Sequence, residues 1–217
     1  MPQKMSMKRS RSSVGPAIVK SLFSKRPKVA TQRYVKRLIA RNEEIKYANV
    51  NNQIAPSTTV GIYTLANTTQ GVGGGSHVGD ECILKSLWLR YTMNVADISN
   101  FLRVIIFVWK PNMGYVAPSA ASILKTTTNP YNLTSMYQED GEDQYSILYD
   151  VTHCLATNGG TPYVKSETIQ RKLNLQQDYI TGSSNCSNNL YILLVSDSAV
   201  PSDPFITWSS RVGFTDA

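Results

Sequence analysis

The first 42 residues contain twelve lysine and arginine side chains and not one aspartate or glutamate. Like charges repel, and the first thirty residues carry few large apolar groups. Such a segment buries too little surface to offset the entropy lost on ordering. We therefore predict a basic N-terminal arm over residues 1–42, of which 1–30 are disordered when free. The folded part is predicted over residues 43–217, called the body below.

The charge of the chain is divided between these two parts. Residues 43–217 carry ten basic and fifteen acidic side chains, so the body is acidic although the whole chain has a formal charge of +7. A one-signed basic terminus is typical of a segment that meets a polyanion, and a solubilising tail is the alternative. The predicted nucleic-acid-binding residues are Lys8, Arg9, Arg11, Lys20, Lys25, Arg26, Lys28, Arg33, Lys36, Arg37 and Arg41.

The arm is expected to bind phosphates and not to read sequence. Neutralised phosphates release counterions, which makes such binding steeply dependent on salt. Only Phe23 and Tyr34 lie among the cations, which argues against stacking on bases by the arm. A short basic helix is predicted over 31–41, while residues 17–23 are left open between a helical turn and an unstructured link.

Two short runs within the arm are also of the kind that nuclear import receptors bind. They predict nuclear localisation through Lys8, Arg9 and Arg11 and through Lys25, Arg26 and Lys28.

Several classes of protein are excluded by the rest of the composition. No apolar run reaches the roughly 18 residues that a membrane-spanning helix needs, so no membrane insertion is predicted, and no secretory signal is predicted either. The three cysteines, Cys82, Cys154 and Cys186, form no CxxC pair. We therefore predict neither a disulfide framework nor a zinc site. Three free thiols indicate a reducing compartment.

The body is predicted to consist of strands, because Thr, Val, Ile and Tyr are frequent and turn residues interrupt the chain often. Eight strands are predicted, over residues 43–50, 59–67, 81–95, 101–110, 145–151, 161–176, 190–196 and 205–214. Residues 81–95 and 101–110 are expected to form a long hairpin, with the odd-numbered residues of 81–95 sharing one face. The almost wholly apolar strand 101–110 is expected at the centre of the core. Eight such strands indicate an all-β closed or double-sheet fold.

The long loops near 68–80, 111–143 and 197–204 are expected to make contacts between subunits. The glycine-rich segment 68–79 lacks the lysine and the following helix of a phosphate-binding loop. The acidic group Glu139, Asp140, Glu142 and Asp143 is interpreted as a solvated loop or subunit contact, with a bound cation left open.

No catalytic residue, metal ligand or cofactor is predicted. The chain has two histidines, His77 and His153. His153 and Cys154 are adjacent on a strand, so their side chains point to opposite faces and cannot act as a nucleophile pair. His77 lies among glycines and is expected to have no partner.

The order of motifs carries a family resemblance. The glycine-rich segment 70–79 is followed by Asp80 and the strand Cys82–Arg90, then by Arg103–Trp109 and later by Tyr145–Asp150. This order, behind a basic arm, resembles the capsid proteins of circovirus-like viruses with small circular single-stranded DNA genomes. It is also similar to coat proteins of small satellite and plant viruses with the same fold.

The resemblance implies a single eight-stranded jelly roll that assembles with itself into a T=1 icosahedral shell of sixty copies. It further implies that the arm packages single-stranded DNA, and that the protein is found in the virion and in the host nucleus. Two alternatives remain open: a coat protein of a small RNA or satellite virus, and a non-viral nucleic-acid-binding β module with a basic tail. A cupin-type enzyme is disfavoured because the two histidines are far apart in the chain.

Overall fold

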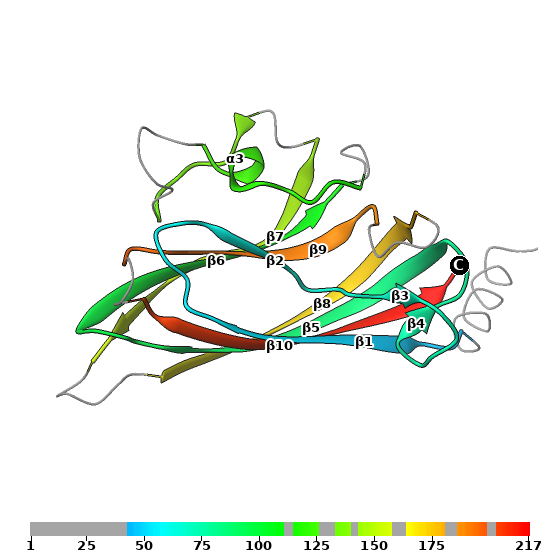
Figure 1. Ribbon diagram of the computed structural model, residues 1–217, viewed down its shortest axis with the longest axis horizontal. Helices are drawn as coiled ribbons and strands as arrows, with labels where there is room; N and C mark the ends of the chain where they lie inside the picture. The colour runs from blue at the N-terminus through cyan, green and yellow to red at the C-terminus, as the bar shows by residue number, and fades with distance from the viewer. Residues whose placement is uncertain are drawn as a thin grey trace, which may run out of the picture. The chain divides into compact units, whose positions relative to one another are not determined.

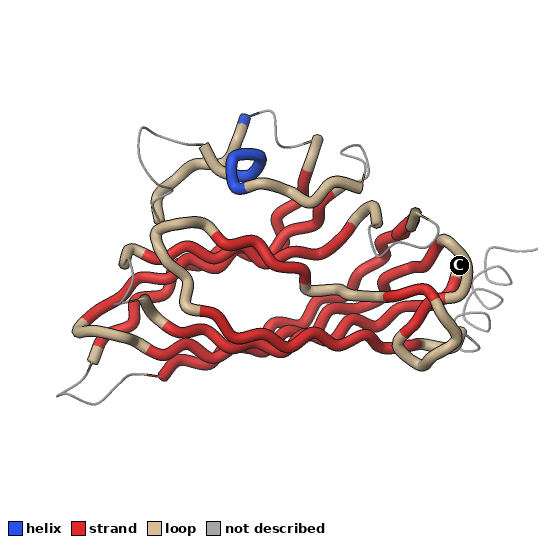
Figure 2. The backbone as a smooth tube through the Cα atoms, in the orientation of Figure 1, coloured by secondary structure: helices blue, strands red, loops and turns tan. Residues whose placement is uncertain are grey.

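The computed structural model describes residues 43–110, 115–125, 133–139, 143–157, 164–180, 186–198 and 203–217. The predicted arm, including the expected helix over 31–41, lies outside these residues. Within them, eight strands form two four-stranded antiparallel sheets that enclose a common core (Figures 1 and 2). The body is an all-β jelly roll, as the sequence predicts.

Each sheet is built from strands that lie far apart in the sequence. The first sheet has the order β1 (Lys46–Ile54), β10 (Phe205–Asp216), β5 (Glu81–Asn94) and β8 (Val164–Asp178). The second sheet has the order β2 (Gly61–Thr64), β9 (Asn189–Ser196), β6 (Ser99–Trp109) and β7 (Tyr145–Ala156). The two-residue strands β3 (Thr69–Gln70) and β4 (Ser76–His77) pair in parallel within the segment expected to be a loop.

The topology is that of one long hairpin wrapped into two layers. β1 pairs with β10, β2 with β9, β5 with β8 and β6 with β7, each pair antiparallel. The expected hairpin between 81–95 and 101–110 is therefore wrong, because β5 and β6 belong to different sheets. The chain crosses between the layers after Asn94, and the hairpin partner of β6 is β7, beyond a connection of more than thirty residues.

Strand β6 is apolar along its length because both of its faces are buried. Leu102, Val104 and Ile106 pack into the core between the sheets. Ile105 and Phe107 point the other way, into a second apolar cluster on the outer side of the second sheet. The expectation of a central core strand is confirmed, and the second cluster explains why the apolar residues do not alternate with polar ones.

The expected side-chain alternation in β5 is correct for only part of the strand. Cys82 and Leu84 are buried at one end, whereas Leu87 and Leu89 are buried beyond it, so the buried parity changes near Lys85. The register with β10 shifts at this point: Phe214 and Gly213 are adjacent, whereas their partners Leu84 and Ser86 are two residues apart, so β5 carries Lys85 as the extra residue of a β-bulge. A bulge inserts one residue and turns the following side chains to the other face of the strand.

Residues 115–125 and 133–139 form a layer, the cover layer, that packs on the outer side of the second sheet (Figure 1). It contains the short helix α3 (Ala120–Ile123), whose first turn is capped by the Ser119 hydroxyl, which accepts from the backbone N–H of Ser122. Leu124 and Tyr137 form an antiparallel bridge between its two halves. Ile105 and Phe107 on the outer face of the second sheet are thereby withdrawn from solvent.

Candidate nucleic-acid interface

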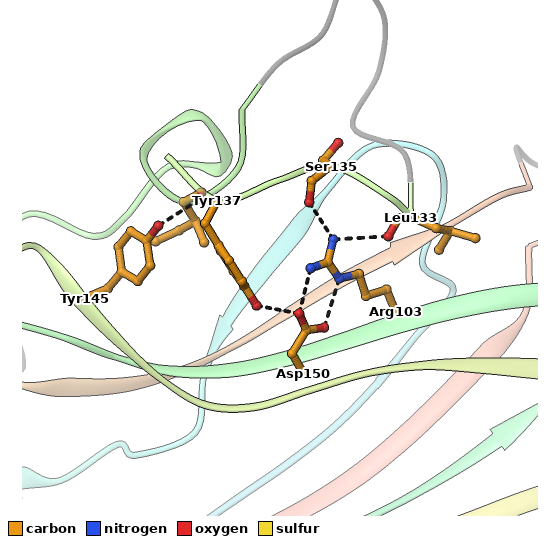
Figure 3. Close-up of polar contacts among 7 residues, drawn as sticks. Arg103, Leu133, Ser135, Tyr137, Tyr145 and Asp150 are labelled. Atoms are coloured by element: carbon orange, nitrogen blue, oxygen red, sulfur yellow. Dashed lines mark hydrogen bonds and ion pairs between the residues drawn. The ribbon is translucent and has the colours of Figure 1, made fainter. Parts of the chain in front are cut away.

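A buried arginine holds the cover layer to the second sheet (Figure 3). Arg103 on β6 is 8% exposed and binds Asp150 on β7 through two hydrogen bonds, from Nε at 2.9 Å and from Nη2 at 2.6 Å. Its Nη1 donates to the backbone carbonyls of Leu133 at 3.1 Å and Ser135 at 2.8 Å. One guanidinium thus joins both strands to the layer above them, in the bidentate geometry that makes such pairs strong.

Tyr137 completes this network. Its hydroxyl donates to Oδ2 of Asp150 at 2.5 Å, and the guanidinium carbon of Arg103 lies 5.5 Å from its ring centroid. Burial alone raises the pKa of the Asp150 carboxyl, but hydrogen bonds from Arg103 and Tyr137 outweigh it and hold that pKa below its ordinary value. Asp150 is therefore an ionised anchor with its partners in place, and its role is structural.

The outer face of the first sheet differs from that of the second, because no described segment covers it (Figure 1). Between Ser86 and Thr92 of β5, outward side chains of the sheet align in four register rows across the strands, which together are called the open face. The two central rows are Gln170–Trp88–Arg211–Asn49 and Thr168–Arg90–Ser209–Asn51. The flanking rows are Lys172–Ser86–Gly213–Tyr47 and Ser166–Thr92–Thr207–Gln53.

The open face is basic on an acidic body. Its four rows contain Arg90, Lys172 and Arg211 and no aspartate or glutamate. Among the described residues, neither Arg90 nor Arg211 forms a salt bridge with a carboxylate, since the acidic partners bind Lys46, Arg103, Lys125 and Lys165 elsewhere. Amide and hydroxyl side chains fill most of the remaining positions, so the face combines positive charge with hydrogen-bonding groups.

An aromatic side chain lies in the middle of this face. Trp88 is 36% exposed and lines a shallow hollow of about 570 Å³, together with Arg90, Arg211 and the polar residues between them. Arg211 is held in place from the β1 side, because its Nε donates to Oδ1 of Asn49 at 2.9 Å and its guanidinium lies 5.8 Å from the Tyr47 ring centroid. The hollow presents an indole beside two guanidinium groups.

The residues predicted to bind nucleic acid or import receptors all lie in the arm, outside the described part of the chain. The absence of a His153–Cys154 pair is explained by the structure. His153 is buried and shares a 2.9 Å hydrogen bond with the Tyr91 hydroxyl, whereas Cys154 is exposed on the opposite face. The Asp150 carboxylate accepts two hydrogen bonds from Arg103 and does not bind His153 or Cys154.

The prediction that His77 has no partner is wrong. Its ring is buried, stacks on Tyr179 with centroids 4.0 Å apart, and places Nδ1 2.9 Å from the carbonyl of Gly79. His77 lies on β4, which pairs with β3, and it contacts Tyr179, the residue directly after β8; its glycine-rich neighbours did not indicate this contact. Its contacts are those of a packed core side chain.

The other features predicted from the sequence lie apart from the open face. Of the acidic group, Glu139 forms an ion pair with Lys125, while Asp140 and Glu142 lie outside the described residues. No group of three or more potential metal ligands occurs in the described ranges. The three cysteines are unpaired, and none of the described helices is long and apolar enough to cross a membrane.

Comparison with known proteins identifies the family. Residues 18–217 match the family described as satellite tobacco necrosis virus coat protein. The chain belongs to this coat protein family. The match favours the resemblance to satellite viruses, so the closer resemblance to circovirus-like capsid proteins is corrected. It also reaches into the basic arm, covering the predicted binding residues from Lys20 to Arg41.

Among solved structures, two viral proteins show low similarity to this chain. A chain from Desmodium yellow mottle tymovirus has 10% identity and a TM-score of 0.39, covering 80% of this chain and 88% of that one. Trichodysplasia spinulosa-associated polyomavirus VP1 has 8% identity and a TM-score of 0.12, covering 80% and 78%. A search of curated proteins finds no match.

The open face was missed in the sequence because its members come from four strands separated by long intervals. Trp88, Arg90 and Arg211 stand at alternate positions within β5 and β10, and only the sheet order places them side by side. One signal was available in the sequence. A strand that places a tryptophan and an arginine among its outward residues exposes a large apolar side chain, and such exposure can mark a binding surface. The net negative charge of the body gave no indication that one of its faces is basic.

Proposed function

We propose that this coat protein assembles from identical copies into a closed icosahedral shell and encloses single-stranded RNA, with its basic arm bound to the phosphates. The observation that carries the proposal is the family match over residues 18–217, which includes most of the arm. The jelly-roll body supports it, since the paired-strand architecture presents the same surfaces on every copy. The shell of sixty copies is part of this proposal.

RNA is proposed in place of DNA because the family match is to a satellite virus coat protein. A coat protein of a small RNA or satellite virus is the alternative that the sequence left open. Phosphate contacts by lysine and arginine do not distinguish the two nucleic acids. Only the nucleic acid inside the particles can distinguish RNA packaging from DNA packaging. The experiment below therefore includes DNA as a possible result.

The decisive experiment is the purification of full-length recombinant protein, followed by electron microscopy, light scattering and nuclease digestion of the extracted nucleic acid. We expect uniform closed particles whose contents are degraded by ribonuclease and not by deoxyribonuclease. Contents sensitive only to deoxyribonuclease would restore the DNA interpretation. A stable species of 24.1 kDa under assembly conditions would refute the shell and favour a monomeric binding module.

The role of the arm is tested separately. A variant lacking residues 1–30 is expected to retain the folded body and to co-purify with much less nucleic acid. A full-length variant with Lys25, Arg26 and Lys28 changed to glutamine should lose part of the same binding and show a shallower dependence on salt. Nucleic-acid content unchanged in both variants would refute electrostatic packaging by the arm.

Nuclear import is proposed for the two basic runs of the arm. A fluorescent protein fused to residues 1–42 should accumulate in nuclei, and glutamine at Lys8, Arg9 and Arg11 should reduce this accumulation. Equal nuclear signals from the two fusions would refute an import role for the first run.

A further inference from the structure

We propose that the open face of the first sheet binds unpaired bases of the enclosed nucleic acid, with one base stacked on Trp88 and the neighbouring phosphates held by Arg90 and Arg211. The inference rests on the proposed function for the identity of its ligand, and it assigns to the body a contact separate from the arm. It also gives the sheet a direction: the open face is turned toward the nucleic acid.

Charge is the first argument. The body as a whole is acidic, yet the four rows of the open face hold three cations and no carboxylate. This segregation makes the face complementary to a polyanion although the body carries a net negative charge. A groove that combines such charge with aromatic platforms is the usual arrangement for single-stranded nucleic acid.

The position of the indole is the second argument. Of the three tryptophans, Trp109 and Trp208 are 3% and 1% exposed, whereas Trp88 is 36% exposed within the hollow. Arg211 is its direct register partner on β10, and Arg90 lies two residues along β5, about 7 Å away. A base on the indole would therefore have a guanidinium beside it on two sides, within reach of the flanking phosphates.

The fixed position of Arg211 is the third argument. Its hydrogen bond to Asn49 and its contact with the Tyr47 ring orient the guanidinium before any ligand arrives. Ordering a free arginine on binding costs side-chain entropy, and an arginine held in advance avoids much of that cost. This contact uses only the Nε donor of Arg211, which leaves the Nη donors of the guanidinium for a phosphate.

A second copy of the body is a poorer occupant of the same face. The core of a stable protein interface is apolar and depleted in charge. The open face has two large aromatic side chains, Tyr47 and Trp88, among amides, hydroxyls and cations. The exposed Val164 and Phe205 lie in the next register row, at its edge, so the open face itself lacks the apolar centre that such an interface needs.

The test uses the full-length chain, dissociated from its shell, with a fluorescently labelled single-stranded oligouridylate and a duplex RNA of the same length as probes. Oligouridylate is expected to quench the exposed Trp88 fluorescence at saturation, and the duplex is not. Trp88→Ala should weaken oligouridylate binding about 5- to 150-fold, the range for loss of one stacked base. Trp88→Phe, which keeps an aromatic face, should fall between wild type and Trp88→Ala.

Matched controls separate this face from general effects. Phe101→Ala removes an aromatic of similar exposure from the second sheet, and Lys125→Gln removes a positive charge from the cover layer. Both should bind oligouridylate as wild type does, whereas Arg90→Gln and Arg211→Gln should each weaken binding and reduce the salt dependence. Equal losses in control and test variants would overturn the assignment.

The outcomes also distinguish this inference from the proposed function. If the arm binds and the open face does not, glutamine substitutions in the arm abolish binding while Trp88→Ala changes neither affinity nor quenching, which overturns the inference alone. If the arm proposal fails, arm substitutions leave affinity unchanged while Trp88 quenching persists. Trp88→Ala that blocks particle assembly with unchanged oligouridylate affinity would assign the face to a second copy instead.

Discussion

Replacement of Asp150 by asparagine isolates the energetic value of the anchor beneath the cover layer. The substitution keeps the size of the side chain but leaves the buried Arg103 charge without its carboxylate. Removing one partner of a buried ion pair costs about 3–5 kcal/mol. The Asp150 side chain is 27% exposed, so solvent screens part of the interaction and we expect a loss of about 2–3 kcal/mol.

The measurement is chemical denaturation of the dissociated protein at neutral pH, since assembly would add its own stabilisation. In a thermal melt, the same loss of stability would lower the melting temperature by about 4–12 °C for a domain of this size. Tyr137→Phe removes one hydrogen bond to the same carboxylate and should cost about 1–2 kcal/mol. Lys125→Gln, which breaks an exposed pair in the same layer, should leave stability unchanged within error.

Acidification supplies an independent check on the mechanism. The folded-state pKa of Asp150 lies below its unfolded value, so its contribution is complete above about pH 4 and is lost as the pH falls through the folded pKa. The difference between wild type and Asp150→Asn should therefore shrink below about pH 4. A difference under about 0.5 kcal/mol at neutral pH, or one that stays constant on acidification, would refute the role of Asp150 as an ionised anchor.

Three further predictions concern other parts of the body. Burial lowers the pKa of His153 below its ordinary value. Its contribution to the free energy of unfolding should therefore be complete above about pH 6.5 and lost as the pH falls through the folded pKa. His153→Gln should flatten that part of a plot of melting temperature against pH. An alanine Cβ at position 213 would lie 2.6 Å from Oγ of Ser86, so Gly213→Ala should cost about 1–2 kcal/mol in denaturation, and adding Ser86→Ala should recover most of it. Deletion of Lys85 should remove the bulge and leave Cys82, Leu84, Leu87 and Leu89 in regular alternation on one face, so the variant should still fold; loss of the β-sheet signal in circular dichroism would refute this account of the bulge.

Much of the fold was accessible from the sequence because each long strand carries its own local signal. Strands β5, β9 and β10 lie within two residues of their predicted bounds, since buried β-branched runs end at turn residues. The pairing was less accessible. Proximity in the chain favoured a hairpin between residues 81–95 and 101–110, whereas the two apolar faces of β6 require a sheet on one side and the cover layer on the other.

Only part of the candidate site could be predicted from the sequence, for a related reason. The arm is recognisable from composition alone, since a dense run of like charges needs no distant partner to be identified. The Arg103–Asp150 pair and the open face depend on side chains brought together by register. No local pattern encodes that Arg211 stands beside Trp88 or that Arg103 reaches the carbonyls of Leu133 and Ser135.

The way Arg103 contacts the cover layer has an evolutionary consequence. Its guanidinium binds main-chain carbonyls of residues 133 and 135, groups that every amino acid provides. The side chain of Met136, 73% exposed in the same stretch, takes no part in that contact. Mutations on this surface can therefore accumulate while its backbone stays fastened to the sheet.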